Sequence, residues 1–174
     1  MKFLVDSDEY RAWHEVGHAV ICLLLGGDVR FIEFLDGTGR GFARTRCIIP
    51  PEINQSVACA GFAAEFFVLK NGLAEQAPGD VRPINQVLFH NAYEDREDFQ
   101  GRTLKSEETF SEAEDTAFRD HAIGTDGHGG LVPIFDRVHP LIKEIVRELC
   151  QSKRLEGRRV KELLQRGGPP TTAD

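Results

Sequence analysis

Two histidines and a glutamate give the sequence its clearest chemical signature. His14 and His18 stand four residues apart, and Glu15 directly follows the first histidine within the run HEVGHAV. On an α-helix, side chains at positions i and i+4 lie on one face, close enough for both imidazoles to reach a single metal ion. A glutamate beside them can polarise a water molecule without itself holding the metal. The pattern predicts the histidine pair and general base of a zinc hydrolase.

The same histidines also have a purely structural interpretation. The sequence turns continuously apolar after His18, so the helix that carries both imidazoles is expected to be largely buried. Buried imidazoles need polar partners, and ordinary protein groups can supply them. A metal ion would satisfy them as well. We favour the metal because the three-residue pattern rarely arises by chance in a chain with only six histidines.

A helix that begins at Ser7 and ends at Gly26-Gly27 must position the histidine pair. The serine hydroxyl can accept a free amide hydrogen bond, and the acids that follow suit the positive end of the helix dipole. Two β-favouring runs within residues 29–49, separated by DGTGRG, predict a hairpin or sheet edge. Further helices are expected over residues 54–70, 84–102, from Ser111 to a break at 125–130, over 133–150 with a kink or restart at Pro140, and over 156–166.

The run from His14 to Val20 resembles the HEAGHA helix in the peptidase domain of the FtsH-type ATP-dependent zinc metalloproteases. In that family a strand, a glycine-bearing turn and an edge strand follow, and residues 29–52 are similar in order and length. The family's next helix carries a Gly-x-Ala-Ala-Glu pattern, which residues 61–65 (GFAAE) match. The C-terminal residues 147–164 are similar to its closing pair of helices. The resemblance therefore covers roughly residues 10–165.

The resemblance implies a third metal ligand, an aspartate in a later helix that is followed by an apolar residue. Asp98, followed by Phe99, fits that description best. The family's usual small or amide neighbours are missing here, so Asp95, one helical turn earlier, and Glu94 remain alternatives. All of these acids could instead form a solvated helix face.

Glu65 needs a partner because it stands within the apolar run AGFAAEFFVL. An ionised carboxylate in such a place loses several kcal/mol of hydration unless another group compensates it. It could orient a ligand imidazole through the ring's other nitrogen, or bind the metal directly. A buried ion pair with Arg44 or Arg46 is the structural alternative.

Composition narrows the class of protein. A formal net charge of −7 argues against nucleic acid as a partner. The four cysteines form no CxxC pair and are expected to be reduced, as in the cytoplasm. The first residues do not resemble a secretory signal, and the longest apolar run, residues 19–25, is far shorter than the roughly 20 residues of a membrane span. We therefore expect a cytoplasmic protein without a membrane partner.

These observations predict one α+β domain over residues 1–166, mainly helical and zincin-like, with a small sheet beside the histidine helix, a C-terminal helical bundle and a disordered tail over 167–174. The expected function is a Zn²⁺-dependent endopeptidase that cleaves unfolded or flexible polypeptides, with Glu15 as general base and metal ligands His14, His18 and Asp98. The strand at Gly41, Phe42 and Ala43 would bind substrate. The sequence has no Walker motif and so no ATPase of its own. A separate ATPase, or self-association of the chain, could therefore deliver substrates to the site. The alternative is a non-catalytic zinc-binding interaction module that keeps the peptidase fold.

Overall fold

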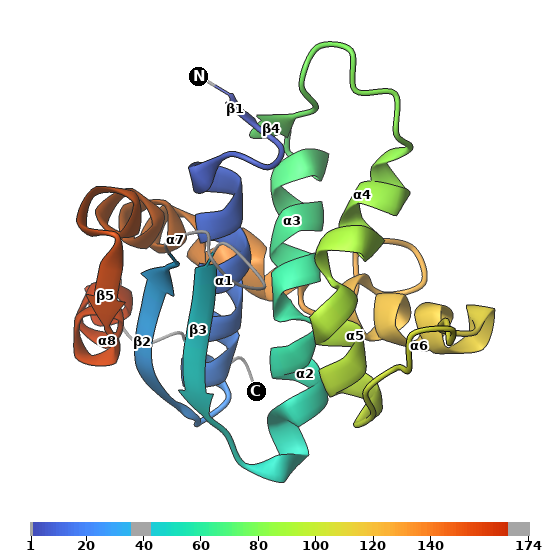
Figure 1. Ribbon diagram of the computed structural model, residues 1–174. Coiled ribbons are helices and arrows are strands. Elements are labelled where there is room, and N and C mark those ends of the chain that lie inside the picture. Colours follow the sequence, from blue (N-terminus) through green and yellow to red (C-terminus); the bar gives the residue numbers. More distant parts are fainter. Residues whose placement is uncertain (1, 36–42, 167–174) are drawn as a thin grey trace.

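A computed structural model describes residues 2–35 and 43–166 of the chain (Figure 1). Helices dominate and small sheets lie beside them, which confirms the expected α+β class. The predicted tail, residues 167–174, lies outside the described residues. The helices are α1 (Asp8–Leu24), α2 (Asn54–Ala58), α3 (Ala60–Lys70), α4 (Ile84–Asn91), α5 (Tyr93–Gln100), α6 (Glu112–Ile123), α7 (Val132–Ser152) and α8 (Gly157–Gln165), with a 3-10 turn at Pro51–Ile53. The strands are β1 (Phe3–Leu4), β2 (Asp28–Phe34), β3 (Ala43–Ile48), β4 (Ala74–Glu75) and β5 (Arg154–Glu156).

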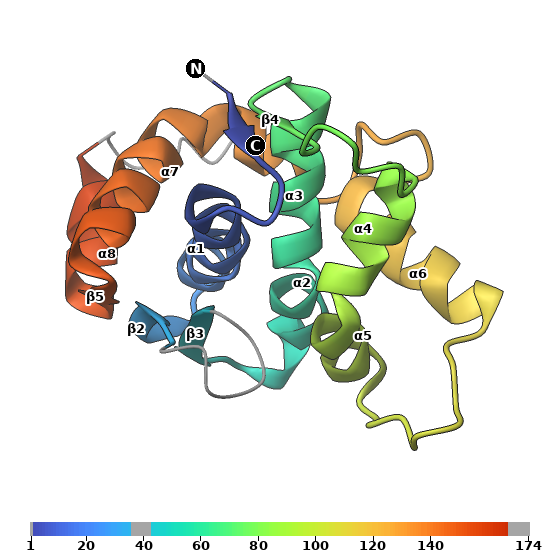
Figure 2. The ribbon, with the colours of Figure 1, turned by 45° about the horizontal axis from the view of Figure 1, so that its top comes forward.

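Helix α1, which carries the histidine pair, lies at the centre of the molecule. Ser7 caps it as expected, because its hydroxyl accepts a hydrogen bond from the Tyr10 backbone N–H at 3.3 Å. Helices α3 and α7 flank α1 on opposite sides, and strand β3 runs beside it (Figure 2). Trp13, Val16 and Val20 are buried in these contacts. The candidate functional residues thus stand on a helix that packs against other elements on several sides.

The sheet beside α1 has three strands in the order β3-β2-β5. Strands β2 and β3 are antiparallel, with Ile32 opposite Thr45, so the predicted hairpin is confirmed. Strand β5 pairs antiparallel with the other side of β2 and was not predicted. Since β2 is the central strand, β3 lies at the edge of the sheet. Strand β3 also contacts α1, the helix that carries the two histidines.

Two predicted helices are each divided by a bend, which corrects the sequence-based boundaries. The helix expected over residues 54–70 breaks at Cys59, where φ is −89° and ψ is 3°. The helix expected over 84–102 breaks at Ala92, where φ is −88° and ψ is 25°. Helix α4 packs on α3 and α5 packs on α2, so the second bend follows the first. Tertiary packing therefore sets both breaks, and local propensity carries no sign of either.

The C-terminal helices agree with the sequence except at one proline. Ser111 and Glu114 form the expected capping box at the start of α6. Helix α7 continues through Pro140 without the predicted restart. Proline cannot donate to the Asp136 carbonyl one turn earlier, but that oxygen lies 3.1 Å from His139 Nδ1, which can donate in its place. Within the described ranges, no helix is both long and apolar enough to cross a membrane.

Candidate metal centre

The two histidines of α1 present the same ring nitrogen to each other. His14 Nε2 and His18 Nε2 lie 3.1 Å apart. The opposite nitrogens are tied to other groups: His14 Nδ1 lies 2.9 Å from Glu65 Oε1, and His18 Nδ1 lies 2.7 Å from the Val57 carbonyl oxygen. Both partners are acceptors, so each Nδ1 carries the hydrogen. In the neutral rings, both Nε2 lone pairs must then point inward.

Asp95 of α5 completes the group. Its Oδ2 lies 3.3 Å from His14 Nε2, and its Oδ1 lies 3.3 Å from His18 Nε2. Oδ2 is buried and has no hydrogen-bond partner of good geometry among the described residues. Two nitrogen lone pairs and a carboxylate that converge in this way repel one another unless a cation sits among them. His14, His18 and Asp95 are therefore a candidate metal-binding triad.

The electrostatics of the triad favour a positive charge at its centre. Burial disfavours a charged imidazole, but Asp95 outweighs this effect and holds the pKa of His14 well above its ordinary value. Asp95 likewise raises the pKa of His18. Burial alone would raise the pKa of Asp95, yet the two imidazoles hold it below its ordinary range. A divalent cation could supply the same compensation and would displace protons as it bound.

The structure brings Asp95 to the histidines and places Asp98 outside the triad. Asp98 lies about one helical turn further along α5, where its exposed side chain lines the adjacent cleft. Burial, with the charge of Asp95, raises the pKa of Asp98. Glu94 also lines the cleft without joining the triad. Of the three acids considered from the sequence, the alternative Asp95, rather than the expected Asp98, has the geometry of a ligand.

Glu65 lies behind the triad rather than within it. Its side chain is only 2% exposed, and Oε1 accepts the hydrogen bond from His14 Nδ1. The Tyr10 hydroxyl donates to Oε2 at 2.8 Å, and Asn91 Nδ2 lies 3.2 Å from the same oxygen. Among the described residues, Glu65 forms no ion pair with Arg44 or Arg46, the structural alternative, and Arg44 pairs with Glu33 instead. Glu65 thus has the contacts of a residue that orients a ligand imidazole.

Glu15 opens onto a cleft beside the triad. The cleft has a volume of about 310 Å³ and lies between α1, β3 and α5. Glu15, His18 and Asp95 line it together with Ala43, the first residue of β3. Thr45 Oγ1 donates to the Glu15 backbone carbonyl at 2.8 Å and so ties the edge strand to the histidine helix. Gly41 and Phe42, also expected to bind substrate, lie outside the described residues.

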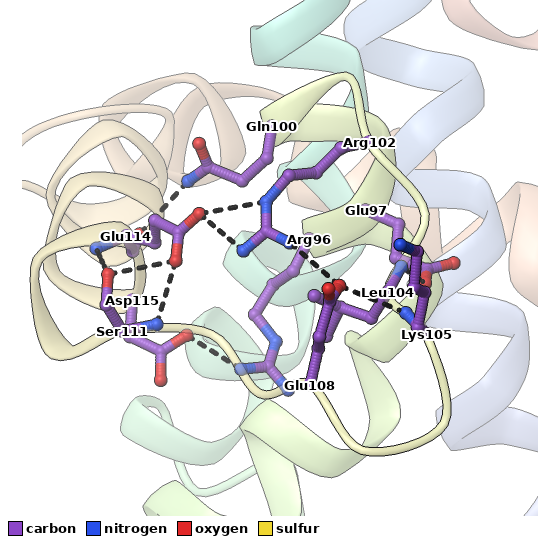
Figure 3. Close-up of polar contacts among 10 residues, drawn as sticks. All are labelled: Arg96, Glu97, Gln100, Arg102, Leu104, Lys105, Glu108, Ser111, Glu114 and Asp115. Carbon is purple, nitrogen blue, oxygen red and sulfur yellow. Dashed lines mark hydrogen bonds and ion pairs between the residues drawn. The ribbon is translucent and has the colours of Figure 1, made fainter.

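A polar cluster holds α5, and with it Asp95, in place (Figure 3). Arg96 Nη1 pairs with Asp115 Oδ1 of α6 at 2.7 Å. The same guanidinium lies 4.4 Å from the centroid of the Phe110 ring, over which it stacks. Further contacts in the cluster join Arg102 to Glu114 and Glu97 to the backbone of Leu104. Contacts with α6 and with the residues that connect it to α5 therefore help to fix the position of α5.

Three residues of the site were not recognised from the sequence as parts of it. A Cβ atom at Gly61 would lie 2.4 Å from His14 Nε2, so only glycine lets α3 approach the rings this closely. Tyr10 stands one turn before His14, and this helical spacing could have predicted their shared face. Asn91 gives no comparable signal, since its contact with Glu65 depends on how α4 packs against α3.

Comparison with protein-family models and with curated proteins shows no match to this chain. What the chain does must follow from the chemistry of the triad, Glu15 and the cleft.

Proposed function

We propose that this protein is a zinc-dependent endopeptidase that cleaves unfolded or flexible polypeptides. The observation that carries the proposal is the convergence of His14 Nε2, His18 Nε2 and the Asp95 carboxylate beside Glu15. Two imidazoles and one carboxylate are a common ligand set of catalytic zinc, which keeps a fourth position for water or substrate. The resemblance of the first helix to FtsH-type peptidases favours the same reaction.

The donor set fits zinc by its chemistry. Both imidazoles offer Nε2 because their Nδ1 atoms are held by Glu65 and by the Val57 carbonyl. The carboxylate of Asp95 would lower the net charge of the site with the ion bound, and its Oδ2, which has no hydrogen-bond partner among the described residues, is an available donor atom. When bound, zinc would polarise the scissile carbonyl and lower the pKa of water.

Glu15 would carry the proton. It stands on the same helix as the ligand histidines and lines the cleft without belonging to the triad. As general base it would take a proton from the attacking water and then give that proton to the amine that leaves. A glutamate that bound the metal could not do this as readily, so its place beside the triad suits the role.

The edge strand β3 would hold the substrate. Ala43 and Thr45 line the cleft, and within the described ranges β3 pairs with β2 on one side only. An extended peptide could add to the free side as a further strand, with its backbone passing the triad. Only a flexible or unfolded chain can present such a segment. A separate ATPase or self-association could deliver folded substrates.

Replacing the base tests this function directly. Glu15→Gln should bind zinc like the wild-type protein but cleave an unfolded substrate such as casein about 100-fold more slowly or worse, because general base catalysis contributes at least that factor. Chelation should abolish wild-type cleavage, and zinc should restore it. Glu9→Gln, in the first turn of the same helix, is the matched control and should cleave normally.

The opposite results would reject the endopeptidase. Full cleavage by Glu15→Gln would remove the glutamate from the mechanism. Zinc binding by the wild-type chain without any chelator-sensitive cleavage would favour the non-catalytic zinc-binding module instead.

A further inference from the structure

The Glu65 carboxylate is enclosed by three donors from two helices. Its Oε1 accepts from His14 Nδ1 at 2.9 Å, and its Oε2 accepts from the Tyr10 hydroxyl at 2.8 Å. Asn91 Nδ2 bridges both oxygens, at 3.4 Å from Oε1 and 3.2 Å from Oε2. Tyr10 and His14 come from α1, and Asn91 is the last residue of α4. Any rotation of the carboxylate that does not simply exchange its two equivalent oxygens would weaken at least one of the three hydrogen bonds.

We propose that Tyr10 and Asn91 are positioning residues that fix Glu65 and, through it, hold the His14 ring ready to bind metal. This inference rests on the metal centre of the proposed function. Neither residue touches the triad's ligand atoms, so each acts through the carboxylate. Their effect is on metal affinity and on the hydrogen position of His14.

The hydrogen position matters because a neutral imidazole has one N–H. With Glu65 Oε1 held opposite Nδ1, the hydrogen stays on Nδ1 and the Nε2 lone pair faces Asp95 and His18. A carboxylate free to turn would release Nδ1, and the form with hydrogen on Nε2 would become populated. That form cannot bind metal through Nε2. Partners of this kind typically contribute 10 to 100-fold to metal affinity.

Tyr10 is suited to the role because it stays protonated. Its side chain is fully buried, and burial together with the charge of Glu65 raises the pKa of the hydroxyl far above its ordinary value. The hydroxyl is therefore a permanent donor. Oε2 of Glu65 therefore accepts the hydrogen bond from the Tyr10 hydroxyl, and Oε1 stays available to accept from His14 Nδ1.

Asn91 connects the helix that leads to Asp95 with the carboxylate that holds His14. It stands at the end of α4, directly before the bend at Ala92 from which α5 carries Asp95 into the site. Its hydrogen bonds to Glu65 hold that bend against α3, which bears the carboxylate. One side chain thus fixes both the orientation of His14 and the place from which the third ligand starts.

The test compares Asn91→Ala and Tyr10→Phe with the wild-type chain. Zinc affinity is measured by competition with a chromophoric chelator. The hydrogen position of His14 is read by ¹⁵N NMR of labelled histidine in the metal-free protein, at a pH that keeps the rings neutral. Asn71→Ala is the matched control, because Asn71 caps α3, the helix of Glu65, and its side chain bonds only to the Phe67 carbonyl among the described residues.

We expect each site variant to bind zinc about 10 to 100-fold more weakly and to show the Nε2-protonated form of His14. The control should keep wild-type values of both. Tyr10→Phe removes one hydroxyl and keeps the ring's packing, so it decides the matter if Asn91→Ala fails to fold. Wild-type affinity and an unchanged hydrogen position in a folded site variant would overturn the proposal.

Cleavage is not a readout here, so the two proposals fail separately. A wild-type chain that binds zinc but cleaves nothing would reject the endopeptidase and leave the positioning roles intact. Wild-type zinc affinity and an unchanged hydrogen position of His14 in the site variants would reject the positioning roles alone, whether or not the wild-type chain cleaves. A wild-type chain that binds no zinc would overturn both.

Discussion

At the scale of single residues, hydrogen bonds to one nitrogen of each imidazole decide which nitrogen is left to bind a metal. Glu65 and the Val57 carbonyl occupy the Nδ1 atoms of the two histidines, and this leaves both Nε2 atoms for a shared ligand. Asp95 faces them with an oxygen that has no hydrogen-bond partner among the described residues. The metal affinity of such a group should depend more on Asp95 than on any other acid nearby.

Asp95→Asn and Asp98→Asn should separate the two candidates for the third ligand. The first change removes a charge 3.3 Å from both imidazoles, so zinc affinity should fall by about 100-fold or more, at least the loss typical of an outer partner. The second should leave the affinity near the wild-type value, since Asp98 is outside the triad. Competition with a chelator measures both. A loss confined to Asp98→Asn would restore the ligand implied by the family resemblance.

The sequence could predict the histidine pair and the candidate base because these residues stand within about one helical turn of one another. It could not choose between Asp95 and Asp98, since both stand on α5 one turn apart and the choice depends on how that helix meets α1. The orienting role considered for Glu65 is consistent with the hydrogen bond to His14 Nδ1. The contact with Asn91 joins helices that no local pattern relates.

At the scale of elements, α1 lies between α3 and α7. The bends at Cys59 and Ala92 allow α5 to approach α1. The caps of α1 and α6 and the β2-β3 hairpin follow from local chemistry and were predicted. The bends at Cys59 and Ala92 were not, because neither residue is a glycine or a proline, the residue types that interrupt a helix locally. They form because α4 packs on α3 while α5 packs on α2. The candidate metal-binding triad lies beside these bends, so its third member, Asp95, was the part hardest to predict.

Arg96 should anchor the element that carries Asp95. Its side chain is 12% exposed, pairs with Asp115 and stacks on Phe110. Arg96→Ala should lower the free energy of unfolding by about 2 kcal/mol, the usual scale for charged hydrogen bonds that are partly buried. It should also weaken zinc binding, because α5 loses its fixed place. Urea unfolding and chelator competition measure the two effects.

Arg102→Ala is the matched control for Arg96→Ala. Arg102 belongs to the same cluster but is 39% exposed, and its ion pair with Glu114 should stabilise the fold much less because water screens the two charges. Equal losses of stability in the two variants would contradict an anchoring role specific to Arg96. Undiminished zinc binding by a destabilised Arg96→Ala would show that α5 is held at Asp95 by other contacts.

At the scale of the whole molecule, many acids are held ionised by arginines and backbone donors. Hydrogen bonds from the Ser111 backbone, with help from Arg102, lower the pKa of Glu114 to about 2. Hydrogen bonds from Arg82 lower the pKa of Asp80 to about 2. The pKa values of Glu33 and Glu148 are also lowered, first of all by Arg44 and Arg159. These acids are spread over separate elements, so acid should weaken the entire fold together.

The metal-free protein should therefore lose stability as the pH falls. A carboxyl group whose pKa is lower in the folded state stabilises the fold fully above its ordinary pKa, and this contribution disappears as the pH drops towards the folded value. For Glu114 the window runs from about 4.5 down to about 2. Melting curves across that range should show a falling Tm, and Glu114→Gln should make the fall shallower. Glu112→Gln is the control, because the structure shows no ion pair from Glu112 to the described residues. A slope in Glu114→Gln as steep as in the wild-type chain would mean that Glu114 is protonated alike in the folded and unfolded states.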